Sequence, residues 1–110
     1  MKFRSLAIAG LLAVLASVAA PLLAEGDPAA GKNKTSMCAG CHGIPGFRAA
    51  YPETYHVPKL GGQNPGYIVA ALKAYKAGER SHPTMKAIAS SLSEQDMADL
   101  AAYYADAGRK

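Results

Sequence analysis

The chain has 110 residues and a formal net charge of +4 at neutral pH, from 12 basic and 8 acidic side chains. This length bounds the architecture to one small domain. The basic residues are dispersed along the chain, which excludes the clustered basic surface that is typical of a nucleic-acid-binding protein.

The N-terminal segment has the three parts of a secretory signal peptide. Residues 1–4 form a short basic start and residues 6–20 form an apolar run, which Pro21 breaks. We predict cleavage after Ala24, with a cut after Ala19 as the alternative. An uncleaved membrane anchor is the other interpretation, because the apolar segment nearly reaches the length of about 20 residues that spans a membrane. Pro21 and the lack of a basic cluster after it favour cleavage.

Residues 25–110 are expected to form the folded domain once the signal peptide, residues 1–24, has been removed. The remaining 86 residues carry a net charge of +2, contain no tryptophan and have Phe47 as their one phenylalanine. Alanine supplies much of the apolar content. A core of this kind is underfilled, so we expect a bound cofactor to complete it and to stabilise the fold.

The first predicted helix begins with Asp27 as its N-cap and Pro28 at its first position. It is expected to run towards Met37 and to deliver a pair of cysteines at its C-terminal end. Gly31 lowers the helix propensity within it. This glycine marks either a frayed helix or a place where another helix approaches closely, and the residues alone favour neither interpretation.

Residues 38–42 have the sequence Cys-Ala-Gly-Cys-His, the attachment signature of a c-type haem. Cys38 and Cys41 can form thioether bonds to two vinyl groups of one porphyrin, and His42 is then held beneath the iron as an axial ligand. A redox dithiol would need a βαβ context and a structural zinc site would need four ligands, and neither pattern is found. The single motif predicts one covalently attached haem c. Together with the signal peptide it indicates a bacterial periplasmic protein.

A long loop and two further helical stretches follow, and no strand alternation is evident. Residues 43–63 are rich in glycine and proline, which is typical of a loop that wraps a ligand. Asn64 and Pro65 begin the second helix, which Gly78 ends, and Ser93 caps the last one. Apolar residues recur at helical spacing in both helices. They are Ile68, Ala71, Leu72 and Tyr75 in the second helix and Met97, Leu100, Ala101 and Tyr104 in the last.

Met85 is the predicted second axial ligand of the iron. It follows residues 81–84, a stretch predicted to be non-helical, and would lie on a loop that closes over the haem from the far side. A thioether suits iron that changes oxidation state without binding oxygen. The other candidates are weaker. Met37 directly precedes the cysteine pair, and Met97 belongs to the apolar stripe of the last helix. His82 is the main rival and His56 a weaker one, but lone loop histidines are more often solvated.

The order of these motifs resembles that of class I c-type cytochromes. Cys-Ala-Gly-Cys-His-Gly is followed by Val-Pro-Lys-Leu-Gly-Gly-Gln, then by Ala-Gly-Glu-Arg, Pro-Thr-Met and Leu-Ser-Glu-Gln-Asp-Met. More narrowly, the chain is similar to the bacterial cytochrome c4 and c553 group of small electron carriers over almost all of residues 25–110. The resemblance implies an all-α fold, with three to five short helices wrapped around one covalently bound haem.

The resemblance also implies the roles of individual residues. His42 would be the proximal and Met85 the distal iron ligand. Pro58 would offer its carbonyl group to the far ring nitrogen of His42, and Leu60 would pack on the haem edge. Gly31 would meet an aromatic residue of the last helix, either Tyr103 or Tyr104.

The chain departs from the family pattern in two respects. Residues 47–56 form a longer and more aromatic stretch than the expected compact loop, and a single haem motif is present where cytochrome c4 itself has two such domains.

We expect a single-domain periplasmic carrier, not an enzyme, that shuttles one electron between redox partner proteins. After signal cleavage it would not insert stably into a membrane. The alternative is a haem c subunit of a larger oxidoreductase complex. A gas-binding or peroxidatic haem needs an open axial position, and Met85 argues against it.

Overall fold

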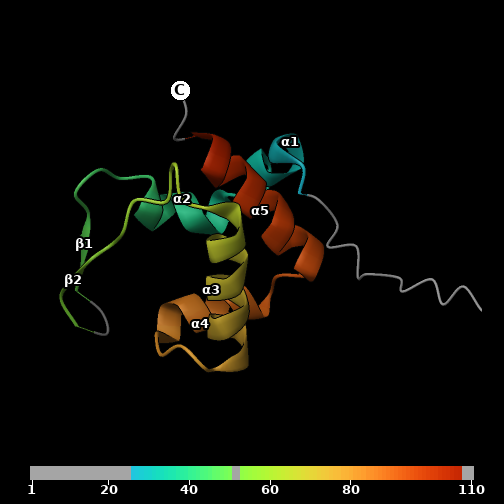
Figure 1. The fold of residues 1–110 in the computed structure, drawn as a ribbon. Coiled ribbons are helices and arrows are strands. Elements are labelled where there is room, and N and C mark those ends of the chain that lie inside the picture. The colour runs from blue at the N-terminus through green and yellow to red at the C-terminus, as the bar shows by residue number, and fades with distance from the viewer. Residues whose placement is uncertain (1–25, 51–52, 108–110) are drawn as a thin grey trace, which may run out of the picture.

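The computed structural model describes residues 26–50 and 53–107, and the predicted signal peptide lies outside them. In chain order the elements are α1 (Pro28–Lys32), α2 (Ser36–His42), β1 (Arg48–Ala49), β2 (Tyr55–His56), α3 (Pro65–Ala77), α4 (Pro83–Ser90) and α5 (Glu94–Ala107). Short helices therefore dominate the fold, as expected (Figure 1). Within the described residues, no helix is long and apolar enough to cross a membrane.

The first predicted helix is in fact two helices. α1 ends at Lys32 and a turn separates it from α2, so the expectation of one continuous helix up to the cysteines is wrong. Asp27 does cap α1, because its carboxylate accepts a hydrogen bond of 3.0 Å from the backbone N–H of Ala29. The hydroxyl of Thr35 donates to the carbonyl oxygen of Lys32 at 3.0 Å. This side-chain bond satisfies a carbonyl group at the end of α1 and favours the turn over continued helix.

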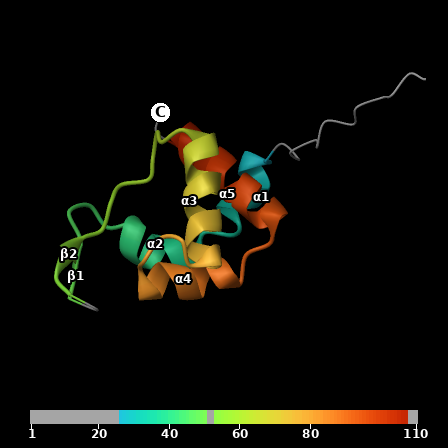
Figure 2. The same cartoon turned by 60° about the horizontal axis from the view of Figure 1, so that its bottom comes forward.

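α1 lies against α5, as both views show (Figures 1 and 2). Gly31 is buried at this contact. A Cβ atom at Gly31 would overlap the carbonyl oxygen of Asp99 and would lie 2.8 Å from the Cβ atom of Tyr103. No larger residue fits without moving the backbone of α5. The close-approach interpretation of Gly31 is therefore confirmed, and the aromatic residue that it meets is Tyr103.

The buried carboxylate of Asp99 ties the N-terminal segment to α5. It is 3% exposed and accepts hydrogen bonds from the Asp27 backbone N–H at 2.9 Å, the Lys34 ammonium at 2.7 Å and the Gln95 amide at 2.8 Å. Lys34 also lies 2.8 Å from the carboxylate of Asp96. The hydrogen bond from Lys34 is the main reason why the pKa of Asp99 is lowered and that of Asp96 falls to about 2. Conversely, the two carboxylates, Asp96 foremost, raise the pKa of Lys34.

The apolar core is small and lies mainly along α5. Met97 and Leu100, from the predicted stripe, are 1% and 2% exposed, and Leu92 packs with them. Leu72 of α3 contacts this cluster from the neighbouring helix. The buried apolar residues of the described structure are Ile68, Ala89, Leu92, Met97, Leu100 and Ala101. Most of them have short or aliphatic side chains, which agrees with the expectation of an underfilled core.

The predicted start and end of α3 and the predicted start of α5 are confirmed. The Asn64 side chain accepts a hydrogen bond of 3.1 Å from the Tyr67 N–H, and Gly78 ends α3 in the left-handed conformation, with φ of 79°. At α5, the Ser93 hydroxyl accepts from the Asp96 N–H at 3.0 Å while the Asp96 carboxylate accepts from the Ser93 N–H at 2.9 Å. This reciprocal pair is a capping box with aspartate in the place usually taken by glutamate or glutamine.

α4 is an element that the residues did not predict. Met85, which was expected on a loop, lies in the first turn of this helix, because Pro83 occupies its first position. His82 precedes the helix in an extended conformation, with φ of −165° and ψ of 105°. The extended backbone of His82 agrees with the restriction that a following proline imposes.

The long loop after α2 contains a small antiparallel hairpin. In it Arg48 faces His56 and Ala49 faces Tyr55. Each strand has only two residues, so the expectation of an irregular loop is wrong only over this short stretch. In both views the hairpin stands beside the helices, on the side where α4 begins (Figures 1 and 2).

The network around Asp99 predicts a specific dependence of stability on pH. Lowered carboxylate pKa values mean that the stability contributed by Asp96 and Asp99 is present above their ordinary pKa of 3.8 and is lost as the pH falls through each lowered pKa, which is about 2 for Asp96. Asp99→Asn should lower the free energy of unfolding at neutral pH by about 1–3 kcal/mol and should flatten its decline in acid. Denaturant unfolding of the purified protein at successively lower pH measures both effects.

The matched control for Asp99→Asn is Glu94→Gln. The Glu94 side chain is 87% exposed and lies 3.5 Å from Lys73. A solvated pair of this kind contributes at most about 1 kcal/mol, so this variant should resemble the unmodified protein at every pH. Equal effects of the two substitutions would show that the buried network has no special role.

Candidate cofactor site

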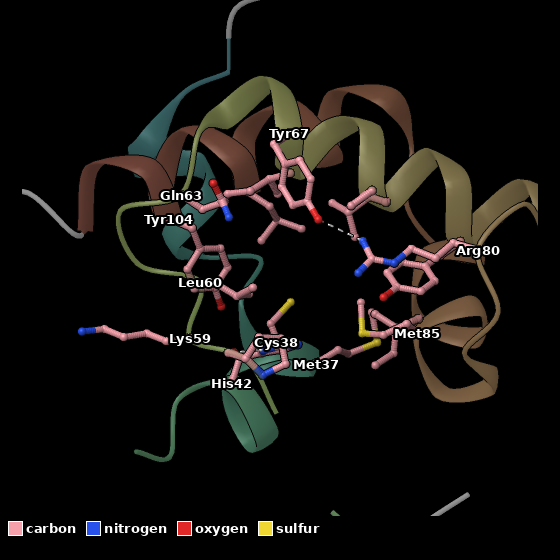
Figure 3. Close-up of a pocket in the computed structure, with 17 residues that line it drawn as sticks. Met37, Cys38, His42, Lys59, Leu60, Gln63, Tyr67, Arg80, Met85 and Tyr104 are labelled. Atoms are coloured by element: carbon pink, nitrogen blue, oxygen red, sulfur yellow. Dashed lines mark hydrogen bonds between the residues drawn. The ribbon is translucent and has the colours of Figure 1, made fainter. Parts of the chain in front are cut away.

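A pocket lies between α2, α3, α4 and α5 and is closed on one side by the segment before α3 (Figure 3). It contains about 930 Å³ of space outside the protein atoms, part of it open to solvent. Cofactor pockets typically have mainly apolar walls. Aliphatic and aromatic side chains from α3, such as Ile68, Leu72 and Tyr75, form much of the wall here. The apolar wall of the pocket therefore suits a flat organic cofactor.

Five of the six predicted site residues line this one pocket: Cys38, His42, Pro58, Leu60 and Met85. Figure 3 shows the Cys38 sulfur pointing into the pocket, with Leu60 and Met85 on opposite sides of the pocket. Cys41 is half-buried and is not part of the lining. It lies on α2 three positions after Cys38, and side chains three and four positions apart share a helix face. Both thiols are unpaired.

The imidazole of His42 is held by the hydrogen bond that the resemblance implied. Its Nδ1 atom lies 2.7 Å from the carbonyl oxygen of Pro58. A carbonyl oxygen only accepts, so Nδ1 must carry the proton and donate it. In the neutral ring the lone pair is then on Nε2, which is the atom left to bind a metal. The backbone of the Pro58 segment therefore sets both the tautomer and the orientation of the ring.

The rival ligands occupy other places in the structure. His82 is absent from the pocket lining, and its Nδ1 atom accepts the backbone N–H of Met85 at 3.2 Å. His56 is exposed on the hairpin, and Met97 is buried in the core. Met37 does line the pocket, but it lies on α2 with the cysteines and its side chain is 49% exposed. Of the described α4 residues that line the pocket, Met85 is thus the one with a metal-binding atom.

Burial governs the acid–base properties of the pocket wall. It is the main cause of the raised pKa of the Cys38 thiol, and a hydrogen bond with Tyr104 opposes this shift only in part. The pKa of Tyr104 is raised as well, first by its own burial and then by the neighbouring Cys38. Both groups therefore stay neutral at physiological pH, which keeps this side of the pocket free of charge.

The charged residues of the lining are Lys59 and Arg80, and both are basic. Figure 3 shows the Lys59 side chain extending away from the pocket, whereas Arg80 lies at its edge. The guanidinium carbon of Arg80 is 4.8 Å from the centre of the Tyr75 ring, and Nη1 lies 3.5 Å from the hydroxyl oxygen of Tyr67. Stacking on an aromatic ring restrains the arginine while leaving most of its donors available. This edge of the pocket suits the carboxylates of a cofactor.

Sequence reasoning missed the part that Tyr67, Arg80 and Tyr104 play in this wall. Tyr104 belonged to a predicted apolar stripe, and a stripe indicates which face of a helix is covered but not whether protein or cofactor covers it. Arg80 follows the glycine that ends α3, and its position over Tyr75 depends on the path of the chain after that turn. The available signal was that Tyr67 and Tyr75 belong to the predicted second helix, whose apolar stripe also lines the pocket.

The donor set fits a covalently held haem. Two thiols on one helix face, an imidazole with a free Nε2 atom and a thioether from another helix are the groups that a c-type haem requires. The apolar wall and the basic edge match a porphyrin body and its carboxylates. None of the described residues that line the pocket is acidic.

Comparisons with known proteins agree with this description. The profile of the cytochrome c family matches residues 28–106. Cytochrome c4 from Pseudomonas aeruginosa is 40% identical over 82 residues, which are 74% of this chain and 39% of the relative. Cytochrome c-554(548) from Halomonas halodenitrificans is 42% identical over 82 residues, which cover 72% of this chain and 94% of that protein. The chain thus matches less than half the length of the cytochrome c4 relative.

A third relative carries a functional name. The thiosulfate dehydrogenase electron acceptor of Stutzerimonas stutzeri is 35% identical over 99 residues, which are 86% of this chain and 44% of that protein.

The size of the pocket predicts that the chain folds poorly when nothing fills it. The double variant Cys38→Ala plus Cys41→Ala cannot hold a group covalently, and its small core leaves the apolar wall exposed. It should show weak near-ultraviolet circular dichroism and rapid proteolysis beside unmodified protein from the same cells. A cooperative thermal transition near that of the unmodified protein would contradict this expectation.

Proposed function

Because this chain belongs to the cytochrome c family, we propose that it is a bacterial periplasmic electron carrier that shuttles one electron between redox partner proteins. The observation that supports this role best is the convergence of Cys38, His42 and Met85 on one apolar pocket. These side chains come from α2 and α4, which are far apart in the sequence.

The proposed cofactor is one covalently attached haem c, since the chain contains a single attachment motif. When bound, this group supplies reversible one-electron exchange at its iron. Cys38 and Cys41 would hold it through thioether bonds. Nε2 of His42 and the sulfur of Met85 would be the protein's ligands to its iron. The bond from His42 to Pro58 at 2.7 Å would keep the imidazole in the orientation required for ligation and would raise its basicity.

A carrier, and not a catalyst, is the role that two protein axial ligands support. If His42 and Met85 both bound the iron, the protein would leave no coordination site for a substrate, for oxygen or for peroxide. Leu60 and Tyr104 line the same pocket and would exclude water from one side of the cofactor. The residues of the site would thus hold and insulate a redox centre without any bond-making step.

The comparisons support a separate carrier over an enzyme subunit. The three relatives described above are named as cytochromes or as an electron acceptor. One of them takes its name from accepting electrons from thiosulfate dehydrogenase, so a dehydrogenase is a suitable class of donor for this chain. The alternative of a haem c subunit within a larger oxidoreductase complex is not favoured by these relatives.

The periplasmic location rests on residues 1–24, whose composition is that of a cleavable signal peptide. Attachment of a c-type haem to the cysteine motif would follow export. After cleavage at Ala24, residues 25–110 would remain as the cytochrome c domain.

Covalent attachment predicts that the haem resists extraction. Acid-acetone treatment of the purified protein should leave the haem on the chain, because two thioether bonds survive conditions that release a coordinated haem. The double variant Cys38→Ala plus Cys41→Ala should carry no covalently bound pigment. Extraction of the haem from the unmodified protein would show that the attachment proposal is wrong.

Axial ligation by Met85 predicts a distinctive set of spectra. The oxidised protein should show the weak far-red absorption band of sulfur bound to haem iron. Met85→His should abolish that band and lower the reduction potential while both axial positions stay filled, because a thioether favours reduced iron more than a second imidazole does. Met85→Ala should open the site to cyanide or carbon monoxide.

Met97→Leu is the control for the Met85 variants. Met97 is 1% exposed in the core, and exchange for an apolar residue of similar volume should cost less than about 1.5 kcal/mol without altering the spectrum. Loss of the band in Met97→Leu or in His82→Ala, together with its retention in Met85→Ala, would assign the ligand to another residue.

A further inference from the structure

We propose that His82 and Tyr55 are positioning residues for Met85, and that the hairpin of β1 and β2 acts as a clamp on the start of α4. This inference rests on the proposed function, because it takes Met85 as an iron ligand. It assigns a role to β1 and β2, which belong to the stretch that departs from the compact loop of the family pattern.

His82 holds the backbone of Met85 directly. As the N-cap residue of α4, it accepts the backbone N–H of Met85 on its Nδ1 atom at 3.2 Å. This bond satisfies one of the free N–H groups at the start of the helix. It also fixes the first turn, in which Met85 lies, and thereby the direction from which the methionine side chain enters the pocket.

An imidazole needs outside support to act as a helix cap. The usual capping residues, serine, threonine, aspartate and asparagine, have short side chains that reach the helix N–H groups with little freedom. The larger ring of His82 must be held at one rotation for Nδ1 to face the N–H group of Met85. Packing around the ring, and not the capping bond alone, has to supply that restraint.

Two tyrosines supply this packing from different elements. The Tyr55 ring on β2 meets the His82 ring edge to face, with centroids 4.9 Å apart and planes at 87°. The Tyr75 ring on α3 lies 6.2 Å away at 79°. Both arrangements are favourable for aromatic pairs, and the nearer ring makes the larger contribution. His82 and Tyr55 are half-buried, so the contact is partly shielded from water.

The hairpin in turn presents Tyr55 at a defined position. Strands of two residues are too short to be stable alone, so other bonds must hold them. The Arg48 side chain bonds Nε2 of His56 through Nε at 3.1 Å and Nη2 at 2.8 Å, and the Val57 N–H donates to the Phe47 carbonyl oxygen at 3.0 Å. A continuous series of contacts therefore runs from the hairpin through the rings of Tyr55 and His82 to the backbone of Met85.

Carbon monoxide binding to the reduced holoprotein tests the clamp, because it reports how often the Met85 position opens. Tyr55→Leu removes the aromatic contact and should raise the opening equilibrium, and with it the observed binding rate, between about twofold and about tenfold. Tyr55→Phe keeps the ring and should bind like the unmodified protein. His82→Asn restores a capping side chain without the ring contact and should lie between the unmodified protein and His82→Ala.

Tyr103→Leu is the matched control. Tyr103 packs near Gly31 at the contact of α1 with α5 and does not line the pocket. Its loss should lower the melting temperature without raising carbon monoxide binding. Equal rises in Tyr55→Leu and Tyr103→Leu would reveal general loosening of the fold and would overturn the positioning role.

The far-red band and carbon monoxide binding, measured on the same variants, separate this inference from the ligand assignment on which it rests. If Met85→Ala keeps the far-red band, Met85 is not the ligand and the clamp has no purpose. If Met85→Ala loses the band while Tyr55→Leu and His82→Ala bind carbon monoxide at the rate of the unmodified protein, the ligand assignment stands and the clamp is refuted.

Discussion

The close contact of α1 with α5 is the constraint on which the other parts of the structure depend. It requires glycine at position 31, because any Cβ atom there would overlap the backbone of Asp99. The carboxylate of the same Asp99 binds Asp27 and Lys34, on either side of α1. One residue of α5 therefore fixes a short helix of low intrinsic stability from both ends. With α1 fixed, the turn that follows directs α2, with Cys38 and His42, towards the pocket.

The pocket is the consequence of a chain that cannot fill its own interior. Its buried side chains are few and mostly aliphatic, and the apolar face of α3, besides packing on the core through Leu72, forms part of the wall of a cavity. The stability of the fold therefore depends on cofactor binding, because a bound group adds its binding free energy to the stability of a marginal domain. The hydrogen bond from His42 to Pro58 also uses the backbone, because a loop carbonyl group orients the imidazole ring without a second polar side chain.

Met85, the proposed second iron ligand, illustrates how a side chain gains rigidity from its surroundings. A side chain in the first turn of a helix has fewer accessible positions than one on a loop, and sites on regular elements are held more accurately. That turn depends on His82, whose ring lies between tyrosines of the hairpin and of α3. Three segments that are separate in sequence thus meet at the start of α4. For an electron carrier, such restraint would keep the second axial position closed in both oxidation states.

Local chemistry was sufficient to predict the attachment motif, the caps at Asp27, Asn64 and Ser93, and the burial of Met97 and Leu100. Each of these depends on residues within about one or two helical turns, so short spacing rules apply to them. The break after α1 and the start of α4 also rest on local bonds, those of Thr35 and His82, which the spacing rules did not use. The grouping of Tyr55 with His82, in contrast, depended on contacts between distant segments. Spacing along the chain contains no information on such contacts, because the path of the loops decides which side chains meet. The sequence by itself therefore determined which groups could hold a haem, and only the tertiary structure decided what surrounds and restrains them.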